Sequence, residues 1–180
     1  MTILVTYASR HGSTGEIASR IAARLNAAGM TVEVQPMKHI TTLSHYDVFV
    51  IGSALYFGSW MKEAVAFARQ HQSEISARPV WLFSSGPLGT ETVDTEGHDI
   101  RESTVPKELA ELTEVLKPRE HVVFPGALDS HNFGVTERMI RALPGGKKLL
   151  VEGDFRDWEE IDAWAEQIAA KIAGPVTVQS

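Results

Sequence analysis

Short, mainly apolar runs alternate with longer amphipathic segments along this chain of 180 residues. The runs occupy residues 3–7, 31–34, 48–51, 80–83 and 121–124. A run without polar alternation is typical of a strand that is buried on both faces. Such strands pair in parallel, and helices connect them and cover both faces of the sheet. The pattern therefore predicts an α/β fold with a doubly wound, five-stranded parallel sheet.

The segments between the runs place apolar side chains at helical spacing. Helices are expected from about residue 13 to the stop at Gly29, over 61–71, from Pro106 to 116, and between Asp157 and Gly174. Ser13 and Glu16 have the spacing of a capping box, and Asp157 is a suitable N-cap for the last helix. Residues 129–156 have no clear period, and only a short helix over 139–143 is expected there.

Composition narrows the class of protein. The chain has 17 Lys and Arg against 23 Asp and Glu, for a net charge of -6, which disfavours nucleic-acid binding. The absence of cysteine excludes thiolate chemistry, disulfides and Cys-ligated metals. No signal peptide or membrane span is recognisable, so a cytoplasmic location without stable membrane insertion is expected. We expect one domain over residues 1–175 and a short tail over 176–180.

Three loops follow strands at the edge of the sheet where ligands bind in folds of this class. These are the first loop (residues 9–14), the second loop (52–60) and the third loop (84–89), which follow the first, third and fourth predicted strands. Doubly wound sheets bind ligands beyond the carboxyl ends of their strands, at the point where the strand order reverses. The three loops are therefore the candidate ligand site.

The first loop is rich in hydroxyl groups and leads directly into a helix. Ser9, Ser13 and Thr14 could hold a terminal phosphate together with the free amides of the helix N-terminus. His11 could add positive charge. Neither a dinucleotide fingerprint nor a Walker motif is present. The alternative is an ordinary capped helix, and Glu16 counts against the phosphate because its charge would repel it.

The second and third loops could hold a flat ring. Tyr56, Phe57 and Trp60 place three aromatic rings in the second loop, and stacking on such rings suits a heteroaromatic ligand. Phe57 and Trp60 could instead pack under the next helix, whereas Tyr56 is expected at the loop tip. The glycines of the third loop, Gly86 and Gly89, would let backbone approach the ligand.

These motifs resemble a known family. The first loop is similar to the FMN phosphate loop of flavodoxins, and residues 46–58 resemble the first isoalloxazine loop of flavodoxin-domain oxidoreductases. Residues 124–128, together with Asp157-Trp158-Glu159, resemble the menaquinone-dependent protoporphyrinogen dehydrogenase branch. The resemblance implies strand order 2-1-3-4-5 and FMN as cofactor, with a deazaflavin not excluded. The implied cofactor-binding residues are Ser9, Arg10, His11, Gly12, Ser13, Thr14, Ser53, Ala54, Leu55, Tyr56, Phe57, Gly58, Ser85, Gly86, Pro87, Leu88 and Gly89.

Three functions are compatible with this resemblance. The first is an FMN-dependent oxidoreductase that transfers electrons between an organic substrate and a quinone-like acceptor, with the chemistry on the flavin and no catalytic side chain. The second is a non-enzymatic electron carrier that docks on redox partner proteins. The third is a binding module of the same fold without FMN.

The remaining polar clusters have ordinary interpretations. Residues 94–99 contain Asp94, Glu96, His98 and Asp99, which could bind a divalent cation but are more typical of a solvated acidic loop. The scattered histidines lack the spacing of metal ligands. No metal site is therefore predicted. Trp81, Trp158 and Trp164 lie on strand or helix patterns and are expected to pack in the core.

Overall fold

The computed structural model describes residues 1–89, 99–100, 104–129, 135–143 and 151–174. At its centre lies a parallel sheet in the order β2-β1-β3-β5-β6. The five strands are β1 (Thr2–Ala8), β2 (Thr31–Pro36), β3 (Val48–Tyr56), β5 (Val80–Ser85) and β6 (Glu120–Phe124). If only these five strands are numbered along the chain, their order is 2-1-3-4-5. The arrangement confirms the predicted α/β class and the predicted strand order.

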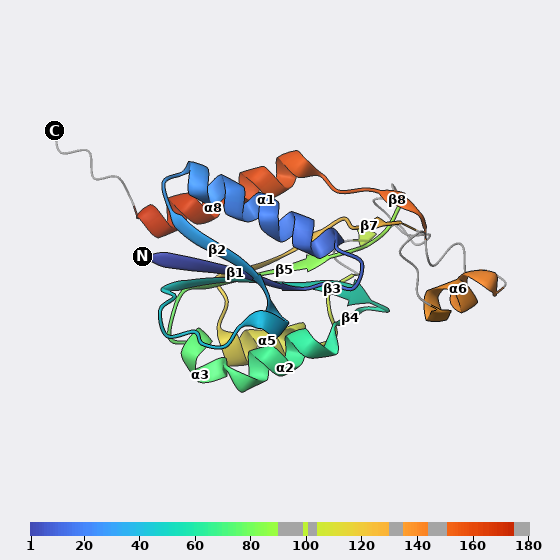
Figure 1. The fold of residues 1–180 in the computed structure, drawn as a ribbon, viewed down its shortest axis with the longest axis horizontal. Coiled ribbons are helices and arrows are strands. Elements are labelled where there is room, and N and C mark those ends of the chain that lie inside the picture. Colours follow the sequence, from blue (N-terminus) through green and yellow to red (C-terminus); the bar gives the residue numbers. More distant parts are fainter. Residues whose placement is uncertain (90–98, 101–103, 130–134, 144–150, 175–180) are drawn as a thin grey trace.

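Helices cover both faces of the sheet (Figure 1). One face carries α1 (Ser13–Ala27) and α8 (Trp158–Ala173). The other carries α2 (Lys62–Gln70), α3 (Gln72–Ile75) and α5 (Leu109–Leu116), with the short helix η1 (Met37–His39) at its edge. Among the described residues, no helix is both long and apolar enough to cross a membrane.

Each face of the sheet has its own apolar core because successive side chains of a strand point to opposite faces. On β1, Ile3 and Val5 pack beneath α1 and α8, whereas Leu4 packs toward α2 and α5. Trp81 and Trp164 are buried in the first of these cores, as expected. The runs of β1, β3 and β5 lack polar alternation because both of their faces are covered, whereas β2, at the edge of the sheet, exposes Thr31 and Glu33.

The strand β3 is longer than predicted. It runs through Gly52 to Tyr56 and turns back through Phe57 and Gly58 into β4 (Ser59–Trp60), so the prediction that a loop begins at Gly52 is wrong. A Cβ atom at Gly52 would lie 2.0 Å from Cζ of Phe83. Gly52 therefore makes room for a core ring inside a strand. Phe57 and Gly58 have φ values of 51° and 73°, which suit a two-residue hairpin turn.

The two predicted helix starts have different outcomes. Asp157 caps α8, with its Oδ1 accepting hydrogen bonds from the amides of Glu159 at 3.1 Å and Glu160 at 3.0 Å. The capping box of Ser13 and Glu16 is wrong. Gly12, with φ of 93°, precedes α1 without a side-chain cap. Both side chains of the expected box instead contact residues more than a hundred positions away.

The segment after β6 forms a small ribbon and a helix. The ribbon pairs β7 (Ala127–Leu128) with β8 (Gly153–Asp154), and α6 (Val135–Ala142) lies between them in the chain, in place of the shorter helix predicted over 139–143. The carboxylate of Asp162 on α8 accepts hydrogen bonds from Arg20 at 2.6 Å and from Arg24, both on α1. This contact joins α8, and the ribbon that precedes it, to α1.

Candidate functional site

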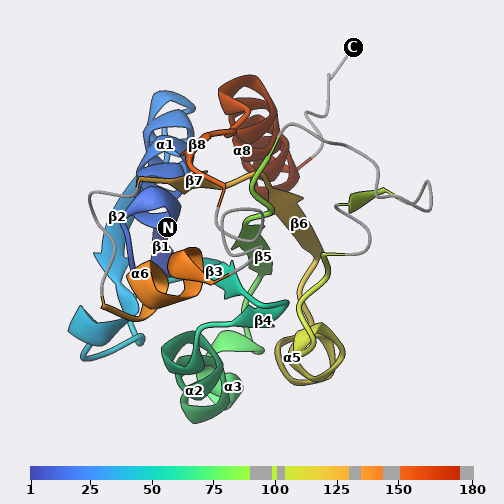
Figure 2. The same cartoon turned by 90° about the vertical axis from the view of Figure 1, so that its right-hand side faces the viewer.

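The three loops meet at the carboxyl ends of the central strands, the end of the molecule that faces the viewer in Figure 2. They enclose a cleft that residues 126–128, at the start of the β7–β8 ribbon, also line. The residues that line the cleft are Ser9, His11, Ser13, Thr14, Ala54, Leu55, Tyr56, Ser85, Gly86, Leu88, Gly126, Ala127 and Leu128. The fold thus brings together ten of the predicted site residues.

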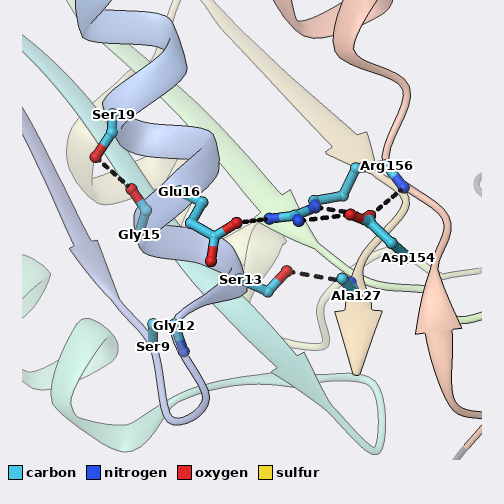
Figure 3. A network of polar contacts seen from close by, with 9 residues as sticks. All are labelled: Ser9, Gly12, Ser13, Gly15, Glu16, Ser19, Ala127, Asp154 and Arg156. Carbon is cyan, nitrogen blue, oxygen red and sulfur yellow. Dashed lines mark hydrogen bonds and ion pairs between the residues drawn. The ribbon is translucent and has the colours of Figure 1, made fainter. Parts of the chain in front are cut away.

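The first loop presents backbone amides at the start of α1. The first hydrogen bond of the helix runs from the amide of Glu16 to the carbonyl of Gly12 at 3.0 Å. The helix itself therefore offers no partner to the amides of Ser13, Thr14 and Gly15. Ser9 Oγ accepts a hydrogen bond from the Gly12 amide at 3.0 Å and fixes the turn (Figure 3). An N-terminus of this kind favours an anion.

The hydroxyl of Thr14 is the most informative polar group of the cleft. Thr14 is 1 % exposed, and its Oγ1 has no hydrogen-bond partner among the described residues. Burying a hydroxyl without a partner costs about 1–3 kcal/mol. A ligand with an acceptor oxygen, such as a phosphate, would remove this cost. The residues present therefore fit a bound phosphate group.

Tyr56 lies beside the first loop rather than at the tip of the second. It is the last residue of β3 and is half-buried. Its ring centroid lies 6.3 Å from that of His11, and the guanidinium carbon of Arg10 lies 6.0 Å from its centroid. The tip of the hairpin is formed by Phe57 and Gly58 instead. Phe57 is 67 % exposed and does not line the cleft.

Two residues of the second loop are structural. Ser53 is fully buried, and its Oγ accepts a hydrogen bond from the Met61 amide at 3.0 Å and donates one to the carbonyl of Ala54 at 3.0 Å. Trp60 is buried, and its Nε1 donates to Ser84 Oγ at 2.8 Å. Trp60 thus follows the packing alternative, and the Ser53 hydroxyl is already used within the protein.

The third loop approaches the ribbon backbone to backbone. The Gly86 amide donates to the carbonyl of Phe124 at 2.9 Å, and the Gly126 amide donates to the carbonyl of Pro87 at 2.9 Å. A Cβ at Gly126 would lie 3.2 Å from the Gly86 nitrogen. Gly86 has φ of 118° and Gly89 has φ of 119°, conformations that favour glycine. Gly89 and Pro87 lie outside the lining of the cleft.

Ser84 connects the hairpin to the far strand through a buried polar chain. It accepts from Trp60 Nε1, and its Oγ lies 2.9 Å from Nε2 of His121. Burial lowers the pKa of His121 to about 4, so the imidazole is neutral near pH 7. A neutral Nε2 can accept a hydrogen bond from the Ser84 hydroxyl. Each donor of this polar chain therefore has an acceptor: the Trp60 indole donates to Ser84, and Ser84 donates to His121.

The sequence did not identify the contribution of the β7–β8 ribbon to the site. Ser13 Oγ accepts a hydrogen bond from the Ala127 amide at 3.1 Å, which docks the ribbon on the first loop (Figure 3). Arg156, just after β8, contacts Glu16 of α1 at 2.7 Å. Gly126 next to a proline was a sequence signal for close backbone approach. Arg156 gave no such signal, because its partner lies 140 positions away.

The other candidates do not form sites in the described part of the chain. Residues 94–98 and His131 lie outside the described residues. No group of three or more His, Asp or Glu that could hold a metal occurs among the residues described. His45 packs on Tyr46 and His71 on Phe67, with ring centroids 3.9 and 4.9 Å apart.

The fold agrees with the comparison to known families. A family model of the flavodoxin domain matches residues 4–144. The chain belongs to this family. Protoporphyrinogen IX dehydrogenase (quinone) of Escherichia coli strain K12 is 24 % identical over 176 residues, which cover 94 % of this chain and 95 % of that protein.

Solved structures share the fold at low identity. Oxidised flavodoxin 2 from Bacillus cereus is similar with a TM-score of 0.59 and 21 % identity, covering 95 % of this chain and 99 % of that one. Rubredoxin oxygen:oxidoreductase from Desulfovibrio gigas has a TM-score of 0.60 and 14 % identity, and the match covers 96 % of this chain but 36 % of that longer one. The flavodoxin fold accordingly spans nearly the whole chain.

Proposed function

We propose that the protein is an FMN-dependent oxidoreductase that transfers electrons between an organic substrate and a quinone-like acceptor. The observation that carries the proposal is the buried hydroxyl of Thr14, which lacks a partner among the described residues beside the unused amides of α1. Membership of the flavodoxin-domain family supports a flavin as the ligand of this site. The comparisons give no support to a deazaflavin.

The proposed roles divide the site into a phosphate end and a ring end. Thr14 Oγ1 and the amides of Ser13 and Gly15 would hold the phosphate of FMN, and the His11 ring lies close enough to contribute. Leu55, Tyr56, Gly86 and Leu88 would hold the isoalloxazine ring, since they line the same cleft. When bound, the flavin supplies the redox chemistry, and the protein supplies position and access.

The character of the cleft favours an uncharged acceptor. The residues that line it, taken from the described part of the chain, include no carboxylate. Leu55, Leu88 and Leu128 give it apolar surface instead. A flavin bound in such a cleft would have uncharged surroundings, which suit the approach of a quinone-like ring, whereas carriers that dock on redox proteins use charge around the flavin for steering. The end-to-end similarity to a protoporphyrinogen IX dehydrogenase (quinone) also supports the enzyme, and porphyrinogen is a candidate substrate.

The alternative is a non-enzymatic electron carrier of the flavodoxin type. The fold similarity to flavodoxins supports it, and so does the acidic balance of residues 85–116, which have eight acidic and two basic side chains. Acidic surface near a flavin would attract a basic partner protein. Turnover of a soluble quinone by the purified protein favours the enzyme. Reduction of a partner protein without quinone turnover favours the carrier.

The first experiment is to purify the protein and identify what is bound. A flavin absorption spectrum and the mass of FMN are the expected results. A protein that neither copurifies with flavin nor binds added FMN would be a binding module of the same fold, and the proposal would be wrong.

We also propose that the protein works in the cytosol and meets a membrane quinone transiently. The last helix carries Glu159, Glu160, Asp162 and Glu166 against Lys171, a balance that anionic lipid would repel. On α6, Met139 is 67 % exposed, so this helix offers an apolar side chain to a lipid surface. Sedimentation with anionic liposomes at physiological salt tests the location. Most of the flavin-loaded protein is expected in the supernatant, and substantial cosedimentation would contradict the proposal.

A further inference from the structure

The first turn of α1 contains a carboxylate that opposes the proposed phosphate site. Glu16 belongs to the turn whose amides face the cleft, and it is the acidic residue of that turn. A negative side chain there satisfies the positive end of the helix dipole and repels a phosphate. Phosphate binding at this site therefore requires a group that offsets the charge of Glu16.

The structure pairs Glu16 with Arg156. Arg156 Nη1 donates to Glu16 Oε2 at 2.7 Å, and Arg156 also binds Asp154 through Nε at 2.8 Å and Nη2 at 2.6 Å. Figure 3 shows the Glu16 side chain pointing toward the guanidinium, with Ser13 and Ala127 joined next to it. The carboxylate of the first turn of α1, next to the cleft, thus has an arginine partner from beyond β8, which it shares with Asp154.

The position of Arg156 is fixed by its surroundings. Its side chain is 8 % exposed, although Glu16 is 63 % exposed. The guanidinium carbon lies 4.5 Å from the centroid of the Trp158 ring, a cation–π contact. Asp154 holds the other edge of the guanidinium as a bidentate partner. Arg156 is therefore built into the ribbon and is not a surface side chain that meets Glu16 by chance.

We propose that Arg156 is a positioning residue that makes the start of α1 selective for a phosphate-bearing flavin. Its positive charge offsets one of the two negative charges of Glu16 and Asp154, and its hydrogen bond holds the Glu16 carboxylate toward the ribbon. Without Arg156, the carboxylates of Glu16 and Asp154 would both lie uncompensated next to the phosphate end. This inference rests on the proposed binding of FMN, and it adds phosphate selectivity to it.

Comparing FMN with riboflavin isolates this effect, because riboflavin has the same ring and lacks the phosphate. The measured quantity is the ratio of the riboflavin and FMN dissociation constants of the apoprotein. In Arg156→Gln this ratio is expected to fall about three- to tenfold, through weaker FMN binding alone. Adding Glu16→Gln to that variant removes the uncompensated charge in the first turn of α1, returns the net charge of the Glu16, Asp154 and Arg156 cluster to its wild-type value, and is expected to restore the ratio to within about twofold of the wild type.

A matched control removes an equivalent ion pair elsewhere. Arg69 holds Glu111 with two hydrogen bonds of 2.6 and 2.8 Å between α2 and α5, away from the first loop. Arg69→Gln makes the same change in net charge, and its ratio is expected to stay within about twofold of the wild type. Should Arg156→Gln not fold, Glu16→Gln in the wild-type chain tests the same balance, with a ratio raised about threefold.

Three outcomes would overturn the inference. The ratio could be unchanged in Arg156→Gln, both flavins could weaken in parallel, or Glu16→Gln could fail to restore FMN binding in the double variant. A wild-type protein that binds FMN and riboflavin equally well would instead overturn the proposed phosphate site itself. The failure of the selectivity proposal is therefore distinguishable from the failure of the proposed function.

Discussion

The first loop and the β3–β4 hairpin line the same cleft but differ in how their polar groups are satisfied. In the hairpin, the Ser53 hydroxyl, the Trp60 indole and the Trp60 amide all have partners within the protein. In the first loop, the Thr14 hydroxyl is buried without one among the described residues. Folded proteins satisfy nearly all buried polar groups. The hairpin is therefore a wall whose polar groups are satisfied within the protein, and the difference supports the proposal that a ligand completes the first loop.

The largest expected effect comes from removing the hydroxyl of Thr14. Thr14→Val keeps the side-chain volume and is expected to weaken FMN binding about ten- to a hundredfold, the value of a hydrogen bond to a charged group. The thermal stability of the apoprotein is expected to stay equal or to rise, because no protein partner loses a bond. Titration of FMN into apoprotein and thermal unfolding measure the two quantities.

Thr113→Val is the matched control for this change. Thr113 lies exposed on α5, so the same substitution there is expected to leave FMN affinity unchanged. Equal FMN affinity in wild type and Thr14→Val would contradict the role of the first loop.

At Ser84, the centre of the buried polar chain, the expected effects are the reverse of those at Thr14: stability falls, and FMN affinity changes little. Ser84→Ala leaves the Trp60 Nε1 proton and the His121 Nε2 without their common partner and is expected to destabilise the protein by about 2 kcal/mol. Denaturant unfolding measures this change. FMN affinity of the folded variant is expected to change little, since Ser84 does not line the cleft.

Ser44→Ala removes an exposed hydroxyl and serves as the control for Ser84→Ala. It is expected to change the unfolding free energy by less than about 0.5 kcal/mol. A Ser84→Ala protein as stable as this control would show that the polar chain does not stabilise the hairpin.

The polar chain of Trp60, Ser84 and His121 also predicts that the free energy of unfolding depends on pH. Burial lowers the pKa of His121 in the folded protein to about 4 from 6.5, so between these pH values the unfolded state binds more protons. The free energy of unfolding therefore rises with pH across this window, and it falls by about 2–3 kcal/mol as the pH is lowered from 6.5 to 4.

His121→Gln is expected to reduce this pH dependence, because glutamine can still accept the Ser84 hydrogen bond and does not titrate. Denaturant unfolding at several pH values between 4 and 7 measures it. An identical pH profile in wild type and variant would contradict a neutral, buried His121.

The smallest effect is expected at Tyr56, a residue of the β3–β4 hairpin that lines the cleft beside the first loop. Tyr56→Leu is expected to weaken FMN about threefold and to shift the flavin absorption, since an aromatic contact contributes modestly beyond its buried area. Flavin fluorescence is expected to rise as the quenching ring is lost. Leu43→Met, a conservative change in the apolar core on the α2 and α5 face of the sheet, serves as a control. An unaltered spectrum in Tyr56→Leu would place the ring elsewhere.

The periodicity of the sequence was sufficient for the sheet and for the position of the first loop. Five apolar runs and the Asp157 cap are local signals, and each corresponds to an observed element. The extent of β3 was not predictable in the same way. Gly52 reads as a strand end in the sequence, but in the fold it accommodates Phe83 from the neighbouring strand.

The parts of the site that sequence reasoning missed depend on contacts between distant residues. Ser13 and Glu16 have the spacing of a local capping box, yet their side chains contact Ala127 and Arg156. The competing partners come from a ribbon that periodicity could not predict, since β7 and β8 have two residues each. Local motifs predicted the ligand end of the molecule, whereas its charge balance required the tertiary structure.

The most direct test of the central claim is amide chemical-shift mapping of the isotope-labelled apoprotein with FMN and with riboflavin. FMN is expected to shift the amide signals of Ser13, Thr14 and Gly15 strongly, because these amides would bind its phosphate. Riboflavin is expected to shift signals of residues 54–56 and 85–88 while leaving the three amides nearly in place. FMN that binds with full affinity but leaves the signals of Ser13, Thr14 and Gly15 unmoved would show that its phosphate does not bind at the first loop.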